Sequence, residues 1–109
     1  MHWLLHLVKS VFGIGKTVLI TNDGRSGQVV YTDFRGSIEF YYEFGGGDCL
    51  AIVTVPNITE WMMQTGRSLS DRTMILNYVG SELVRQQAPE YIYMITEDAI
   101  EVRKPLKPA

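Results

Sequence analysis

The chain is poor in the residues from which disulfides, metal centres and acid–base catalysts are built. Its 109 residues include one cysteine and two histidines. A single cysteine excludes an intramolecular disulfide, which fits a reducing compartment. The histidines, His2 and His6, are four residues apart, but no second Cys/His pair exists to complete a metal site with them. Since no Ser/His/Asp or Cys/His set is evident either, we expect no metal, no cofactor and no catalytic residues.

Basic residues are also few, with 10 Lys and Arg against 12 Asp and Glu and a net charge of −2. Binding of nucleic acid usually needs a basic patch, because contacts to phosphate supply most of the non-specific affinity. The one basic cluster is Arg103, Lys104 and Lys107, and Pro105 and Pro108 interrupt it. We therefore interpret it as a short solvated end and expect no nucleic-acid partner.

Long hydrophobic runs are missing too. The N-terminal stretch MHWLLHLVKSVF lacks the basic start of a signal peptide, and His6 and Lys9 interrupt its apolar residues. It is also far shorter than the roughly 20 apolar residues that span a bilayer. We expect no membrane insertion and a cytoplasmic location.

Apolar residues are nevertheless abundant enough for a folded core. The chain is 46% hydrophobic and 20% charged, which is typical of a globular protein and argues against disorder. Its length predicts one domain, residues 1–109, which buries roughly two-thirds of the surface of the unfolded chain.

The clearest structural pattern covers residues 37–55. Alternate residues of the first run, SIEFYYEF, are apolar, whereas the second run, CLAIVTV, is apolar almost throughout and places Cys49 in a buried strand. The GGGD between them predicts a tight hairpin turn rather than an anion cradle. Glu39 and Glu43 share the polar face, but four strand residues span about 13 Å, too far for a glycosidase-type acid pair. The residues expected on the buried face of the first run are Ile38, Phe40, Tyr42 and Phe44.

Periodicity along the rest of the chain predicts further helices and strands. Asn57, three residues before Glu60, is a capping-box-like helix start. The expected elements are a helix over 2–12, strands over 17–21 and 28–32 with a turn at 22–24, the hairpin, a helix to about residue 64, a helix from Ser68 or Ser70 to about residue 88, and strands over 91–96 and 99–103. The order α-β-β-β-β-α-α-β-β predicts an α+β fold, with a mainly antiparallel sheet of about five to six strands and helices packed on one face.

One segment partly matches a phosphate-binding loop. Residues 10–17, SVFGIGKT, supply the final Gly-Lys-Thr, but Ser10 stands where the first glycine is required. The β-branched residues that follow favour a strand, whereas the phosphate loop opens a helix. We interpret the segment as a plain helix-to-strand turn.

A second segment, GRSLSDR over residues 66–72, is a candidate anion site. Ser68 would lie at a helix N-terminus between Arg67 and Arg72, and free backbone amides with two guanidinium groups suit a phosphate or carboxylate. The same letters also form an ordinary helix cap in which Asp71 offsets the arginines, and this interpretation is favoured.

Two segments carry aromatic and methionine residues of the kind that protein interfaces favour. Trp3 and Phe12 lie on the apolar arc of the expected first helix, and Trp61 and Met62 lie in the short helix after Pro56. The arc of the first helix could be covered by its own sheet, by a second subunit or by a membrane surface. For the cluster of Trp61, Met62 and Met63, burial in the core is the favoured interpretation, and an interface is the alternative.

These features favour a non-catalytic protein-interaction or regulatory module, either a homodimer or a subunit of a larger assembly. The support is an absence of catalytic parts together with the candidate interface residues Trp3, Phe12, Trp61 and Met62. The alternative is a small-ligand binder or small enzyme with a pocket between the sheet and the helices, using Arg67, Ser68 and Arg72 for an anionic group.

Overall fold

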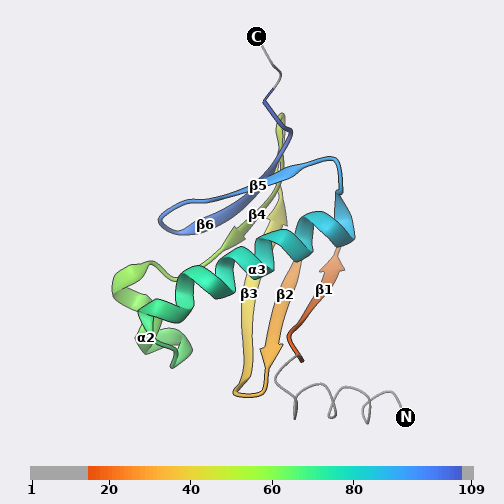
Figure 1. Ribbon diagram of the computed structural model, residues 1–109. Coiled ribbons are helices and arrows are strands. Elements are labelled where there is room, and N and C mark those ends of the chain that lie inside the picture. The colour runs from red at the N-terminus through yellow and green to blue at the C-terminus, as the bar shows by residue number, and fades with distance from the viewer. Residues whose placement is uncertain (1–14, 107–109) are drawn as a thin grey trace, which may run out of the picture.

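Residues 15–106, which the computed structural model of the protein describes, form a six-stranded sheet and two helices (Figure 1). The helix expected over residues 2–12, with Trp3 and Phe12, lies outside the described residues. Neighbouring strands are all antiparallel, in the order β1-β2-β3-β4-β6-β5. The strands are β1 (Thr17–Asp23), β2 (Ser26–Asp33), β3 (Gly36–Phe44), β4 (Cys49–Thr54), β5 (Ile92–Ile95) and β6 (Ala99–Arg103). The expected α+β class with an antiparallel sheet is confirmed.

Strands β1 and β2 form a hairpin that is longer than the sequence pattern indicated. Their last pair is Asp23 with Ser26, so the turn is Gly24–Arg25 rather than residues 22–24. Gly24 has φ 76°, in the left-handed region that a residue with a Cβ rarely adopts. Glycine therefore fixes the position of this turn.

Strand β3 alternates as expected over most of its length. Ile38, Phe40 and Tyr42 are buried, whereas Phe44, the last residue of the strand, is 43% exposed. Strand β4 alternates as well, and Cys49 is only half-buried. The prediction of a fully buried second strand is therefore wrong. The reason is that the described helices cover one face of the sheet, so alternate residues of β4 lie on the other face.

Helix α2 (Ile58–Thr65) begins and ends at the expected signals. The Asn57 side chain accepts a hydrogen bond from the backbone N–H of Glu60 at 3.0 Å. Gly66 ends the helix with φ 73°, and its N–H donates to the carbonyl of Met62. Both caps satisfy backbone groups that a helix leaves without partners.

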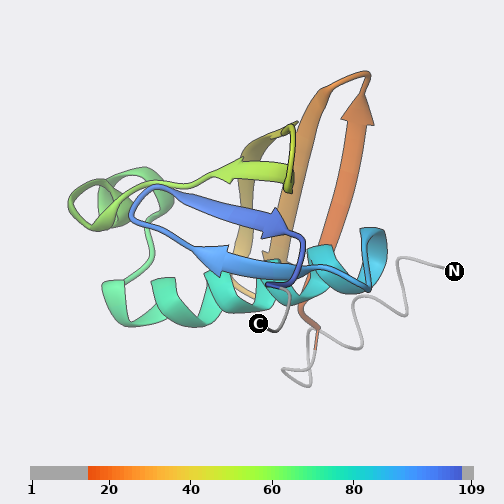
Figure 2. The same cartoon turned by 90° about the horizontal axis from the view of Figure 1, so that it is seen from above.

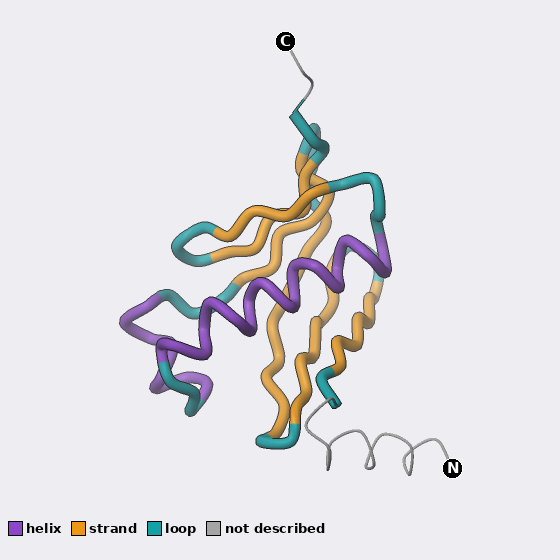
Figure 3. The backbone as a smooth tube through the Cα atoms, viewed as in Figure 1, coloured by secondary structure: helices purple, strands orange, loops and turns teal. Residues whose placement is uncertain are grey.

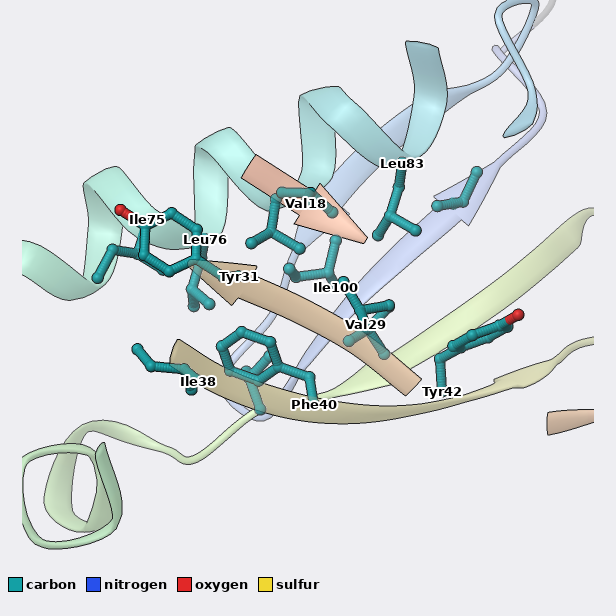
Figure 4. Close-up of a cluster of buried hydrophobic side chains, with 14 of the residues drawn as sticks. Val18, Val29, Tyr31, Ile38, Phe40, Tyr42, Ile75, Leu76, Leu83 and Ile100 are labelled. Atoms are coloured by element: carbon teal, nitrogen blue, oxygen red, sulfur yellow. The ribbon is translucent and has the colours of Figure 1, made fainter. Parts of the chain in front are cut away.

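Helix α3 (Leu69–Gln87) provides the main packing surface for the sheet. The expected stripe of Ile75, Leu76, Val79 and Leu83 is buried, each side chain at most 3% exposed. The tube in Figure 3 shows α3 running across the strands on one side of the sheet. Figure 4 shows its apolar side chains meeting Val18, Val29 and Ile100 from the strands.

The sheet curves around α3 rather than lying flat beneath it. The helix contacts both edge strands, β1 and β5, as well as β6, and Figure 2 shows β5 lying alongside it. Close approach of β5 depends on Gly80, since a Cβ at this position would lie 2.4 Å from the ring of Tyr93. The curvature gives the sheet an inner face that holds α3 and an outer face on which no described helix lies.

Candidate functional site

The structure separates the three residues of the candidate anion site, Arg67, Ser68 and Arg72. Arg67 is 6% exposed, and its guanidinium donates to both carboxylate oxygens of Asp33, at 2.8 and 2.9 Å. It also donates to the backbone carbonyl of Gly36 at 3.2 Å. Its charge is therefore already balanced within the protein, by a carboxylate 34 residues earlier in the sequence.

Arg72 binds other groups than Arg67 does, and its role is structural. It is 8% exposed and donates to the backbone carbonyls of Pro56 and Glu97 at 2.9 to 3.1 Å. These bonds tie α3 to the segment before α2 and to the turn between β5 and β6. The Ser68 side chain is paired with that of Ser70 at 2.9 Å and does not cap the helix. Arg67, Ser68 and Arg72 thus do not converge on one site.

The aromatic and methionine cluster of α2 divides between core and surface. Trp61 is fully buried, stacks on Phe40 at a centroid distance of 6.5 Å, and donates from its indole N–H to the carbonyl of Ser68 at 2.9 Å. The expectation that Trp61 lies at an interface is corrected, because its whole surface contacts its own core. Met62 and Met63 are 58% and 82% exposed and remain available for contact.

A cavity of about 170 Å³ lies between the sheet and the N-terminal half of α3, and it includes one predicted site residue, Arg67. The sequence interpretation missed the other polar residues around it. The sequence did carry a signal for Asp33, because the strand alternation that places Val29 and Tyr31 inward also places Asp33 inward. The lining residues are Gly15, Lys16, Tyr31, Asp33, Phe34, Arg35, Arg67, Asp71, Met74 and Ile75.

The floor of this cavity is a hydrogen-bonded cluster of Tyr31, Asp33 and Arg67. The Tyr31 hydroxyl donates to Asp33 Oδ2 at 2.9 Å, and the backbone N–H of Arg35 donates to Oδ1 at 2.8 Å. Burial alone would raise the pKa of Asp33, but the hydrogen bonds from Arg67, Arg35 and Tyr31 outweigh it and lower this pKa to about 2. Burial, followed by the bond to Asp33, raises the pKa of Tyr31 above its usual range. Asp33 is therefore ionised and Tyr31 neutral at pH 7.

The mouth of the cavity carries a second, looser set of charges. Arg35 Nη1 lies 3.3 Å from Asp71 Oδ2, with the two side chains 48% and 27% exposed. Lys16 Nζ lies 3.8 Å from the sulfur of Met74 and 5.6 Å from the centre of the Tyr78 ring. Among the described residues, no carboxylate lies within ion-pair distance of Lys16. The lining thus contains three cations and two carboxylates, a net charge of +1.

The outer face of the sheet is the second candidate surface, and we call it the open face. Strand alternation places Leu19, Tyr41, Ile92 and Met94 on it, each between 40% and 61% exposed. Val30 and Ile52, half-buried, lie among them. No described residue outside the sheet is seen to cover this face (Figure 2).

Charged side chains on the open face are mostly acidic. Glu39, Glu43 and Glu101 lie on it, together with Arg103, whose guanidinium pairs with Glu101 at 3.0 Å. Glu43 is opposite Ile52, and Ile52 is opposite Glu101, so acids and apolar residues alternate across the strands. These four charged groups carry a net charge of −2.

Over residues 15–106, no group of three or more His, Cys, Asp or Glu side chains is placed to hold a metal ion. Within the same part of the chain, no helix has the length and apolar character needed to cross a bilayer. Comparison of the chain with protein-family models, with curated proteins and with solved structures gives no match.

Proposed function

We propose that the protein is a non-catalytic interaction module that binds another protein through the open face of its sheet. The observation that carries this proposal is the group of exposed apolar side chains, Leu19, Tyr41, Ile92 and Met94, on a face that no described helix covers. Exposed aromatic and methionine side chains are enriched where proteins meet.

Charge favours a different protein over a second copy of this chain as the occupant. In a two-fold homodimer the same patch meets itself, so Glu39, Glu43 and Glu101 would approach their own copies. Like charges brought together at an interface oppose binding. The partner that fits is a protein surface with apolar residues and an excess of lysine or arginine.

Site-specific photocrosslinking tests this proposal. A photoreactive phenylalanine analogue replaces Tyr41 on the open face in one variant and Met63 on α2 in another, both in the full chain. On illumination, the analogue at position 41 should crosslink the chain to a different protein, and the analogue at position 63 should not. That protein, once purified, should bind the parent and lose about tenfold or more in affinity for the variant Glu39→Lys/Glu43→Lys, since two attractive contacts become repulsive.

The alternatives give distinct results. Crosslinking of position 41 to a second copy of this chain, with a dimer seen by light scattering, would replace the proposed partner with self-association. Crosslinking from position 63 alone would move the interaction to the Met62–Met63 surface of α2. Unchanged binding of the purified partner to the double-lysine variant would remove the role of charge.

A further inference from the structure

The cavity at the N-terminal half of α3 lies on the inner side of the sheet, away from the open face, and its dimensions suit a small molecule. Its volume is about 170 Å³, slightly more than the roughly 150 Å³ of an apolar cavity that holds benzene. Buried side chains form its walls, since Tyr31 and Ile75 are at most 1% exposed. The space therefore accepts one ring or a short branched chain.

The floor of the cavity is fixed before any ligand arrives. Asp33 accepts hydrogen bonds from the Tyr31 hydroxyl, the Arg67 guanidinium and the backbone N–H of Arg35. Within the described residues, no buried side-chain nitrogen or oxygen lacks a partner. A rigid, internally neutral floor reduces the entropy lost on binding, but it offers no charge of its own to a ligand.

Charge for a ligand comes instead from Lys16 and Arg35 at the mouth. Among the described residues, the Lys16 ammonium donates to the sulfur of Met74, a weak acceptor, and Arg35 uses one nitrogen for a long, half-exposed contact with Asp71. Two cations therefore face one carboxylate. A guanidinium and an ammonium that line the same cavity suit a carboxylate ligand.

Apolar side chains border the same opening. Phe34 is 72% exposed, Met74 is 49% exposed, and both line the cavity with the buried Ile75. An exposed phenylalanine at the mouth of a cavity can lie against the apolar part of a ligand that enters it. The lining thus combines a cationic side with an apolar side.

We infer that this cavity binds a small organic carboxylate, with Lys16 and Arg35 holding the carboxylate and Phe34, Met74 and Ile75 contacting its apolar part. Benzoate is the probe, because its ring matches the volume and its charge matches the mouth. Benzamide has the same shape without the charge, and inorganic phosphate has charge without an apolar part.

Two-dimensional NMR titration of the full chain tests the site. Benzoate should shift the amide signals of residues 16, 34, 35 and 74 in a saturable way, and benzamide should bind at least about tenfold more weakly. The variant Lys16→Gln/Arg35→Gln should lose about tenfold or more in benzoate affinity. Arg25→Gln is the matched control, because Arg25 is an exposed arginine in the turn at the other end of β2, and it should bind benzoate as the parent does.

Several outcomes overturn the inference. Equal binding of benzoate by the parent and the double variant would exclude Lys16 and Arg35 as ligands. Phosphate binding as tightly as benzoate would exclude a role for the apolar wall, and signals that do not shift with benzoate would exclude the site. Variant folding is checked by thermal unfolding, and Phe34→Ala, which changes an exposed side chain, tests the apolar wall separately.

Discussion

The two ends of the interface between α3 and the sheet are built differently around cavities of similar size. At the N-terminal end of the helix, the cavity of about 170 Å³ is lined by Lys16, Asp33 and Arg67 among others. At the C-terminal end, a cavity of about 150 Å³ is lined by Ile20, Leu83 and other mostly apolar residues, together with the uncharged Gln87. The same side of α3 thus contacts a charged cluster at its N-terminal end and a mostly apolar core at its C-terminal end.

The difference shows in how each end holds its side chains. Figure 4 shows Tyr31 beside Ile75 at one end, with Leu83 and Tyr42 toward the other. At the charged end, directional bonds set the positions, with four donors aimed at the Asp33 carboxylate. At the apolar end, burial and shape set them, as in the edge-to-face contact of Tyr42 with Phe44, whose ring centroids are 5.8 Å apart. The charged end is therefore sensitive to pH and to single deletions of charge, and the apolar end to volume.

Arg67→Met gives the largest expected effect. It leaves the nearly buried Asp33 carboxylate, 12% exposed, without its cation. Removing one partner of a buried ion pair lowers the free energy of unfolding by about 4 kcal/mol. Urea unfolding at pH 7 measures the loss.

Two controls separate the lost charge from lost packing. Asp33→Leu/Arg67→Met removes both charges and should recover part of the stability, since no unpaired ion is left. Arg85→Met breaks the exposed Glu82–Arg85 pair on the same helix, where Arg85 is 68% exposed, and should leave the unfolding midpoint nearly unchanged. A double variant no more stable than Arg67→Met would show that packing of the Arg67 side chain dominates.

Leu83→Ala tests the apolar end. Leu83 is 3% exposed and already borders a cavity, so its removal enlarges a space that the neighbours do not fill. The expected loss is about 3 kcal/mol. Because no titratable group is changed, this loss should be the same at pH 3 and pH 7. A loss that varies with pH would show that the two ends are coupled through the helix.

The smallest expected effect is the acid dependence of stability that Asp33 contributes. Its pKa is about 2 in the folded protein against an ordinary 3.8, so the folded state favours the ionised form. The contribution is complete above about pH 4 and is lost as the pH falls through 2, and it amounts to about 2 kcal/mol.

Comparison with Asp33→Asn isolates this contribution, because other carboxylates titrate in the same range. The stability difference between the parent and Asp33→Asn should narrow by about 2 kcal/mol between pH 5 and pH 2. A difference that stays constant would mean that Asp33 has an ordinary pKa in the folded state. The charged end would then resemble the apolar end in its response to acid.

Local sequence signals predicted most of the elements but not the contacts between them. Asn57 and Gly66 marked the ends of α2, and the stripe from Ile75 to Leu83 marked the inner side of α3. These signals work because capping and periodicity act over a few residues. Cys49 shows the limit, since an apolar run does not reveal that helices cover only one face of its sheet.

The candidate sites were harder to predict, because they too depend on contacts between elements. Arg67 was singled out for its neighbours in the sequence, yet its partner Asp33 is the last residue of β2, 34 residues earlier. Trp61 was a candidate interface residue by its type, with core burial as the other interpretation, and only the structure shows its indole packed on a ring and bonded to a carbonyl inside the core. Pairing and burial of this kind depend on elements that are far apart along the chain.

Composition and short-range patterns were enough to predict the α+β class, the helix caps and the inward stripe of α3, and they show directly that histidine and cysteine are scarce. Three findings needed the folded structure: Arg67 meets Asp33, Lys16 and Arg35 share the mouth of one cavity, and Leu19 and Met94 lie on one open face. Strand pairing and helix packing bring these residues together, and local preferences do not predict contacts between residues that are far apart in the sequence.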